Sequence, residues 1–199
     1  MTAPNSRKFP ELYKKLDINM AELGCIMYDI EPFEVVKFVE GGEDDLYFSD
    51  PNRTPDFKFA QGAVAESNAH VTLLFGLLEL GPVWKNYVDA VLDGWSMDSV
   101  RISSVGYFPS SVEGEDYSVI VGHIELTPEL VEGHERLQLL PHIDTFPGYK
   151  PHITLAYVKN GPSGVEWTDS TRDKWVESLN KEFAGKSFPV SQINYGAEK

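Results

Sequence analysis

Short apolar runs alternate with segments of helical spacing along the whole chain. Apolar positions recur three and four residues apart in residues 82–92 and 168–183, which predicts a helix in each. Thr127 followed by Pro128 is typical of a helix start, and this third helix is expected to reach about Leu140. The remaining apolar runs predict β-strands at residues 24–30, 69–75, 100–108, 117–126, 152–158 and 187–195. The order predicts an α+β fold with a mainly antiparallel sheet, because regular strand–helix alternation is missing.

We expect one domain with an extension at its start. The 199 residues suit a single domain or a two-lobed unit. Residues 1–19 are assigned to the N-terminal extension, and residues 20–199 to the domain. Within it, residues 41–68 predict a long loop that is acidic at its start, and such loops are often functional lids. Arg53 and Lys58 would make the lid basic, although a plain surface role is the simpler interpretation.

Two matching tetrapeptides carry the candidate chemistry. They are His70-Val-Thr-Leu73 and His152-Ile-Thr-Leu155, and each begins a predicted strand. Side chains alternate between the two faces of a strand. In each tetrapeptide the His and the Thr therefore share one face, while the two apolar residues point to the other. If the two strands are neighbours, two imidazoles and two hydroxyls face each other across a groove.

These side chains suit the cleavage of a phosphodiester. A neutral imidazole accepts a proton from an attacking hydroxyl, and an imidazolium gives one to the leaving oxygen. The hydroxyls of Thr72 and Thr154 can donate hydrogen bonds to phosphate oxygens. A single His-x-Thr sequence is common in ordinary strands, so only the repeat points to catalysis. We expect no metal and no cofactor, because few metal ligands are on offer and no phosphate-binding loop is present.

Charge and cysteine content narrow the function classes. With 17 Lys and Arg against 31 Asp and Glu, the net charge is −14, which should repel a long nucleic acid. Cys25 is the only cysteine, so an intrachain disulfide and a multi-cysteine zinc site are excluded. No signal peptide and no membrane-spanning run is apparent in the sequence. We therefore expect a cytoplasmic protein with no membrane partner, and the sequence does not indicate its oligomeric state.

The paired His-x-Thr motifs resemble those of the two-histidine (2H) phosphoesterase superfamily. The resemblance extends over roughly residues 20–195. It implies a bilobal fold, with antiparallel sheets lining a central cleft, helices outside and one motif from each lobe. It also implies that His70 and His152 form the acid/base pair, and that Thr72 and Thr154 hold the phosphate.

Within the superfamily, the chain is most similar to the bacteriophage anti-CBASS nucleases, which degrade the cyclic di- and trinucleotide signals of bacterial defence. Residues 24–30, 66–73 and 149–155 carry the similarity, whereas the acidic loop and the extended N-terminus depart from it. It implies metal-independent hydrolysis of a 3′–5′ phosphodiester by 2′-hydroxyl attack. The expected partner is a small cyclic nucleotide, and the expected location is the host cytoplasm.

A few residues outside the motifs are candidates for substrate binding. Tyr28, in the first predicted strand, either stacks on a base or is a core tyrosine. Tyr149 and Lys150 precede the second motif, where Lys150 either offsets phosphate charge or is an ordinary solvated lysine. His123 either reaches the cleft or is an ordinary strand residue. The two other histidines are interpreted as structural: His134 and His142.

Two other functions remain open. One is a 2H enzyme that acts on RNA ends or on linear 2′–5′ oligonucleotides, which the strong negative charge mildly disfavours. The other is a non-catalytic protein that sequesters a nucleotide. Retention of both His-Thr pairs speaks against this binder, because binding alone does not need two titratable groups facing one phosphate.

Overall fold

The computed structural model describes residues 23–31, 33–46, 69–109, 117–144, 146, 148–159 and 167–196, with residues 167–170 described as backbone only. The predicted extension at residues 1–19 and the predicted loop beyond residue 46 lie outside the described residues. Arg53 and Lys58 belong to this loop and are likewise outside the described residues. The elements are, in chain order, β1 (Gly24–Ile30), η2 (Val36–Phe38), α2 (Gly42–Asp45), β2 (His70–Leu77), η3 (Gly81–Trp84), α4 (Lys85–Val91), β3 (Ser99–Pro109), β4 (Tyr117–Ile124), α5 (Pro128–Leu137), β5 (His152–Lys159), α6 (Trp167–Phe183) and β6 (Ser187–Asn194).

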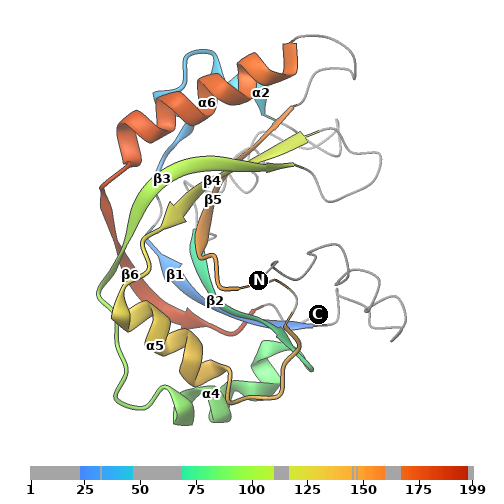
Figure 1. The fold of residues 1–199 in the computed structure, drawn as a ribbon, viewed down its shortest axis with the longest axis vertical. Helices are drawn as coiled ribbons and strands as arrows, with labels where there is room; N and C mark the ends of the chain where they lie inside the picture. Colours follow the sequence, from blue (N-terminus) through green and yellow to red (C-terminus); the bar gives the residue numbers. More distant parts are fainter. Residues whose placement is uncertain are drawn as a thin grey trace, which may run out of the picture.

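The described strands form one six-stranded sheet in the order β2-β1-β6-β3-β4-β5. All pairings between these strands are antiparallel. The α+β prediction is thereby confirmed. The sheet is curved, with α6 at one end of the molecule and α4 and α5 at the other (Figure 1). Although β2 and β5 stand at opposite ends of the strand order, their Cα atoms approach within 8 Å of each other.

Local sequence signals explain how these elements begin and end. β3 and β4, which follow each other in the chain, pair antiparallel. The hydroxyl oxygen of Thr127 accepts a hydrogen bond from the backbone N–H of Leu130, 3.3 Å away, and so caps the start of α5. This helix ends at Leu137, before the predicted Leu140. Pro141 follows, and a proline disfavours helical backbone in the residue before it.

The start of the predicted loop at residues 41–68 is folded against α6. Residues Gly42–Asp45 form the short helix α2, which corrects the prediction of a loop there. The indole N–H of the fully buried Trp175 donates to Asp45 Oδ2, 2.9 Å away. Lys174 Nζ lies 2.6 Å from the same oxygen. A buried indole needs a hydrogen-bond acceptor, and Asp45 supplies it.

The outer edge of β2 is occupied by residues 141–143. The N–H of Ile143 donates to the carbonyl oxygen of Gly76 at 2.8 Å, and the N–H of Leu78 donates to that of Pro141 at 3.2 Å. Gly76 has a φ of 106°, and a Cβ there would lie 2.3 Å from the Ile143 carbonyl oxygen. Only glycine fits this close approach of two backbones. On β5, Leu46 forms an antiparallel bridge with Val158.

Candidate active site

Both tetrapeptides lie in strands and alternate as predicted. In β2, Val71 and Leu73 are fully buried, while His70 and Thr72 are partly exposed. In β5, the same pattern holds: Ile153 and Leu155 are fully buried, and His152 and Thr154 are partly exposed. Each strand thus presents its imidazole and its hydroxyl on the face opposite to the core.

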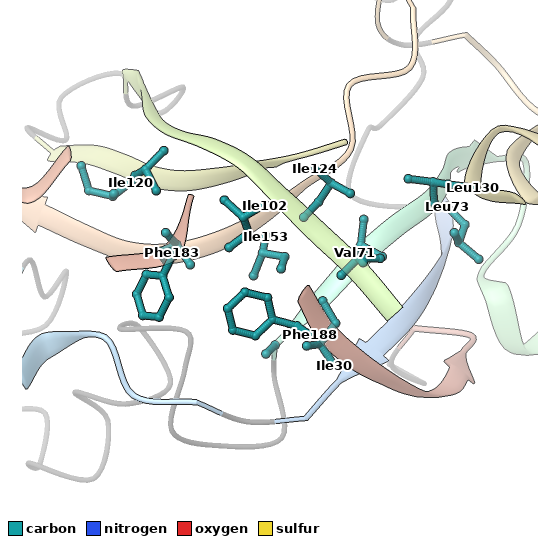
Figure 2. Close-up of a cluster of buried hydrophobic side chains, with 14 of the residues drawn as sticks. Ile30, Val71, Leu73, Ile102, Ile120, Ile124, Leu130, Ile153, Phe183 and Phe188 are labelled. Atoms are coloured by element: carbon teal, nitrogen blue, oxygen red, sulfur yellow. The ribbon is translucent and has the colours of Figure 1, made fainter. Parts of the chain in front are cut away.

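The apolar residues between each His and Thr belong to one core. Val71 and Ile153 are members of the same buried cluster, and Figure 2 shows both among Ile102 and Ile124. Since β2 and β5 also approach each other, their polar residues project on the same side, away from this cluster. We call the side that carries His70, Thr72, His152 and Thr154 the motif face. The structure therefore places the two predicted motifs together.

A side-chain hydrogen bond joins the two motif strands. The hydroxyl of Tyr149, which precedes β5, donates to the carbonyl oxygen of Thr72 in β2 at 3.0 Å. The Tyr149 ring stacks on the His134 imidazole, with ring centroids 3.9 Å apart and planes 3° from parallel. His134 Nδ1 in turn donates to the Leu73 carbonyl oxygen, 2.6 Å away. These contacts fix the approach of the second motif to the first.

The orientation of His152 is set by its own backbone neighbourhood. Its Nδ1 lies 3.0 Å from the carbonyl oxygen of Lys150. A carbonyl only accepts hydrogen bonds, so Nδ1 carries the proton and Nε2 has the lone pair in the neutral ring. Such a bond fixes the tautomer, and it leaves the lone pair on Nε2 of His152 available to accept a proton.

The residues expected to bind substrate do not all lie on the motif face. Tyr28 pairs with Val71, on the core side of the sheet, and its ring lies 5.8 Å from that of Trp95. Tyr28 packs against the core cluster, as the interpretation of a core tyrosine expects. Tyr149 is engaged in the strand-joining contacts, and burial raises the pKa of its hydroxyl. Lys150 is exposed two residues before His152.

The two motif histidines face different kinds of residue across their neighbouring strands, a carboxylate in one case and an imidazole in the other. Asp29 in β1 pairs with His70, and His123 in β4 pairs with His152. Two amides from β6 hold the Asp29 carboxylate: Asn194 donates to Oδ1 at 2.8 Å and Gln192 to Oδ2 at 3.1 Å. The motif face is thus acidic beside the first motif, and it carries an extra imidazole beside the second.

Several aromatic residues lie on the motif face although the sequence alone does not place them there. The ring of Phe108 lies edge-on to both His123 and His152, with centroids 5.9 and 5.2 Å away. Tyr117 and Tyr157 form a similar edge-on pair, with centroids 5.6 Å apart. Their only sequence signal is alternation within each strand. Alternation does not say which residue of the next strand lies opposite.

The described residues contain no cluster of three or more His, Cys, Asp or Glu side chains that could hold a metal ion. His142, interpreted as structural, has its Nδ1 2.8 Å from the Leu140 carbonyl oxygen and its Nε2 3.4 Å from Asp144.

In the part of the chain that the structure covers, no helix combines the length and the apolar character needed to span a bilayer.

Comparison with known proteins places the fold. No protein-family model matches the chain, and no curated protein matches it. The solved structure of Kluyveromyces marxianus Usb1 superimposes with a TM-score of 0.51 at 12% sequence identity, covering 86% of this chain and 92% of that one. At this identity the likeness concerns the fold alone. The chain has the fold of the 2H phosphoesterases, as the paired motifs implied.

Proposed function

We propose that this protein is a 2H phosphodiesterase in which His70 and His152 exchange protons with a nucleotide substrate. The observation that carries the proposal is the meeting of β2 and β5, which brings both His-x-Thr pairs to one face. The fold shared with Usb1 supports the enzyme class. The hydrogen bond between His152 and the Lys150 carbonyl supports a role for Nε2 in proton transfer.

The proposed reaction begins with a ribose 2′-hydroxyl. One motif histidine accepts its proton while the 2′-oxygen forms a bond to phosphorus. The bond from phosphorus to the 5′-oxygen breaks, and the other histidine gives that oxygen a proton. The products are a 5′-hydroxyl and a 2′,3′-cyclic phosphate, which water can then open with the histidine roles reversed. Thr72 and Thr154 donate hydrogen bonds to the nonbridging oxygens as charge develops.

Our proposed substrate class is the cyclic di- and trinucleotides, with 3′–5′ linkages and no need for a metal. The similarity of the motif surroundings to the phage anti-CBASS nucleases supports this class, and with it a role in evading bacterial immunity inside the host cytoplasm. The net charge of −14 supports a small substrate over a long one, because a long backbone would be repelled.

A second candidate function is cleavage at RNA ends or in linear 2′–5′ oligonucleotides. The fold shared with Usb1 is compatible with it, since one fold serves several substrates. A third candidate is a nucleotide-sequestering protein without turnover.

A single cleavage assay separates the three. The protein is incubated with EDTA and with cyclic di- and trinucleotides, linear 2′–5′ and 3′–5′ oligomers, and tRNA, and products are followed by chromatography. We expect cleavage of the cyclic compounds alone. Cleavage of linear RNA alone would favour the second candidate, and stoichiometric binding without products would favour the third.

Variants test the assignment of the two histidines. Replacing His70 or His152 by alanine should each lower the rate by at least about 10²-fold. His142→Ala is the matched control, because its imidazole is bonded away from the motif face to Leu140 and Asp144. Full activity in either motif variant would overturn the proposed mechanism.

A further inference from the structure

A third imidazole lies beside the second motif. His123 in β4 is directly opposite His152 in β5 and opposite Ser104 in β3. Side chains directly opposite each other on one face of an antiparallel pair have Cβ atoms about 4.5–5.5 Å apart. His123 therefore stands one strand spacing away from a proposed proton-exchanging group. The mechanism above makes no use of it.

The neighbouring strand leaves room for this imidazole. A Cβ at Gly106 in β3 would lie 2.6 Å from His123 Nε2, so any other residue there would displace the ring. Phe108, two residues further along β3, is edge-on to the rings of both His123 and His152. The three rings form one aromatic group on the motif face, built from three strands, and we call it the 108/123/152 group.

His123 offers hydrogen-bonding atoms that the described part of the protein does not use. Its imidazole makes no hydrogen bond to any described residue, and Ser103 bonds only to its backbone oxygen. Burial lowers the pKa of His123, and the charges of His152 and Lys150 lower it further. The imidazole is consequently neutral at pH 7, with one donor and one acceptor nitrogen.

A neutral ring and a phenyl group suit a nucleoside better than a second phosphate. A neutral imidazole does not offset phosphate charge, whereas its donor and acceptor match the polar atoms of a base or a ribose. A phenyl ring offers a base an apolar surface, and contacts of this kind between bases and aromatic rings are worth about 1–3 kcal/mol. Both groups adjoin His152, which on the proposed mechanism adjoins the scissile phosphate.

We propose that His123 and Phe108 bind the nucleoside next to the scissile phosphate. His123 hydrogen bonds to its polar atoms, and Phe108 packs against its base. The inference rests on the proposed function, and it adds a substrate-binding subsite beside the four motif residues.

Binding of an uncleavable ligand tests this subsite without using turnover. The probes are cyclic dinucleotides of 2′-deoxyadenosine and of 2′-deoxyguanosine, which lack the attacking hydroxyl, and the measurement is isothermal titration calorimetry. His123→Leu should weaken binding about five- to tenfold, the value of one lost hydrogen bond. Phe108→Leu should weaken it about tenfold. Gly106→Ala should resemble His123→Leu, because it displaces the imidazole.

Two control variants make the result specific. His123→Gln keeps a donor and an acceptor, so it should bind within about threefold of the unmodified protein. Tyr107→Leu removes the adjacent aromatic of β3, which projects to the other face and lies under the Arg172 guanidinium at 4.0 Å. Its binding should be unchanged. Circular dichroism and thermal melts establish that each variant is folded.

The inference is overturned if neither probe binds, if His123→Leu and Phe108→Leu bind as well as the unmodified protein, or if Tyr107→Leu loses as much. It is also overturned if His123→Leu binds normally but cleaves ribonucleotide substrates slowly, since His123 would then act in proton transfer. Failure of the proposed function has a different signature. The unmodified protein would not cleave ribonucleotides, or cleavage would persist without His70 or His152.

Discussion

The hydroxyl of Tyr149 donates a hydrogen bond to the backbone carbonyl of Thr72, 77 residues away in sequence and 3.0 Å away in space. Tyr149 precedes the second motif, and Thr72 belongs to the first. The bond therefore ties the segment that leads into β5 to β2, and these two strands are not paired with each other in the sheet. The bond helps to hold the two motifs at a fixed distance from each other, which neither strand could do alone.

Tyr149→Phe should lower both stability and activity. The change removes one hydrogen bond and leaves the Thr72 carbonyl without this partner, which costs about 1–3 kcal/mol of unfolding free energy. Urea denaturation measures the loss, and steady-state kinetics should show a slower reaction as the motifs separate. Tyr87→Phe, at an exposed position, is the matched control and should change neither quantity. An unchanged unfolding free energy in Tyr149→Phe would show that this hydrogen bond does not stabilise the fold.

Each motif threonine should contribute to the reaction more than to folding. Thr72→Val and Thr154→Val keep the side-chain shape and remove the hydroxyl. Removing one donor to a transition-state oxyanion typically costs about 10²–10³-fold in kcat. Single-turnover rates on the cleaved cyclic nucleotide measure the effect, with thermal melts as the control for folding. A loss below about threefold would exclude the hydroxyl concerned from phosphate stabilisation.

His123 should make the protein less stable below neutral pH. Burial, with the charges of His152 and Lys150, lowers its pKa in the folded state from the ordinary value of 6.5. The unfolded chain therefore binds a proton at this site first as the pH falls through about 6.5, and the unfolding free energy falls with it. In His123→Gln, the loss of unfolding free energy between pH 7 and pH 5 should be smaller. Identical pH dependence in both proteins would contradict the lowered pKa.

Trp175 should contribute strongly to the packing of α6 against α2 and the core. Its side chain is fully buried and bonded to Asp45, so Trp175→Ala leaves a large cavity and removes the hydrogen bond. Such changes cost about 3–5 kcal/mol, which chemical denaturation can measure. Leu139→Ala, at a side chain that is 77% exposed, should stay within about 0.5 kcal/mol of the unmodified protein. A small effect at Trp175 would mean that the helices relax to fill the space.

The elements and the two motifs could be predicted because they depend on local pattern. Alternation alone placed His70 and Thr72 on one face of β2, and the burial of Val71 and Leu73 confirms it. The Thr127 cap was also visible in the sequence, since capping involves only the residues of one helical turn. The end of α5 was missed by three residues, because helix ends are set by a few competing local contacts.

The surroundings of the motifs depend on strand register, which a single strand does not encode. Tyr28 shares the alternation of the buried Ile26 and Ile30, so its place on the core side was available in the sequence. The position of His123 opposite His152 was not available, because it requires the pairing of β4 with β5. The same holds for Asp29 and His70, which meet through the pairing of β1 with β2.

The residues that cover the two edge strands of the sheet, β2 and β5, also affect whether copies of this protein associate through those edges. An open strand edge offers unpaired N–H and C=O groups to a neighbouring chain, and this is a common route to aggregation. Here the bonds from residues 141–143 occupy part of the free side of β2, and the Leu46 bridge occupies part of the free side of β5. Where these segments lie, the edge strands offer no free row of backbone groups to a second molecule. This disfavours aggregation by edge-to-edge strand pairing at high protein concentration.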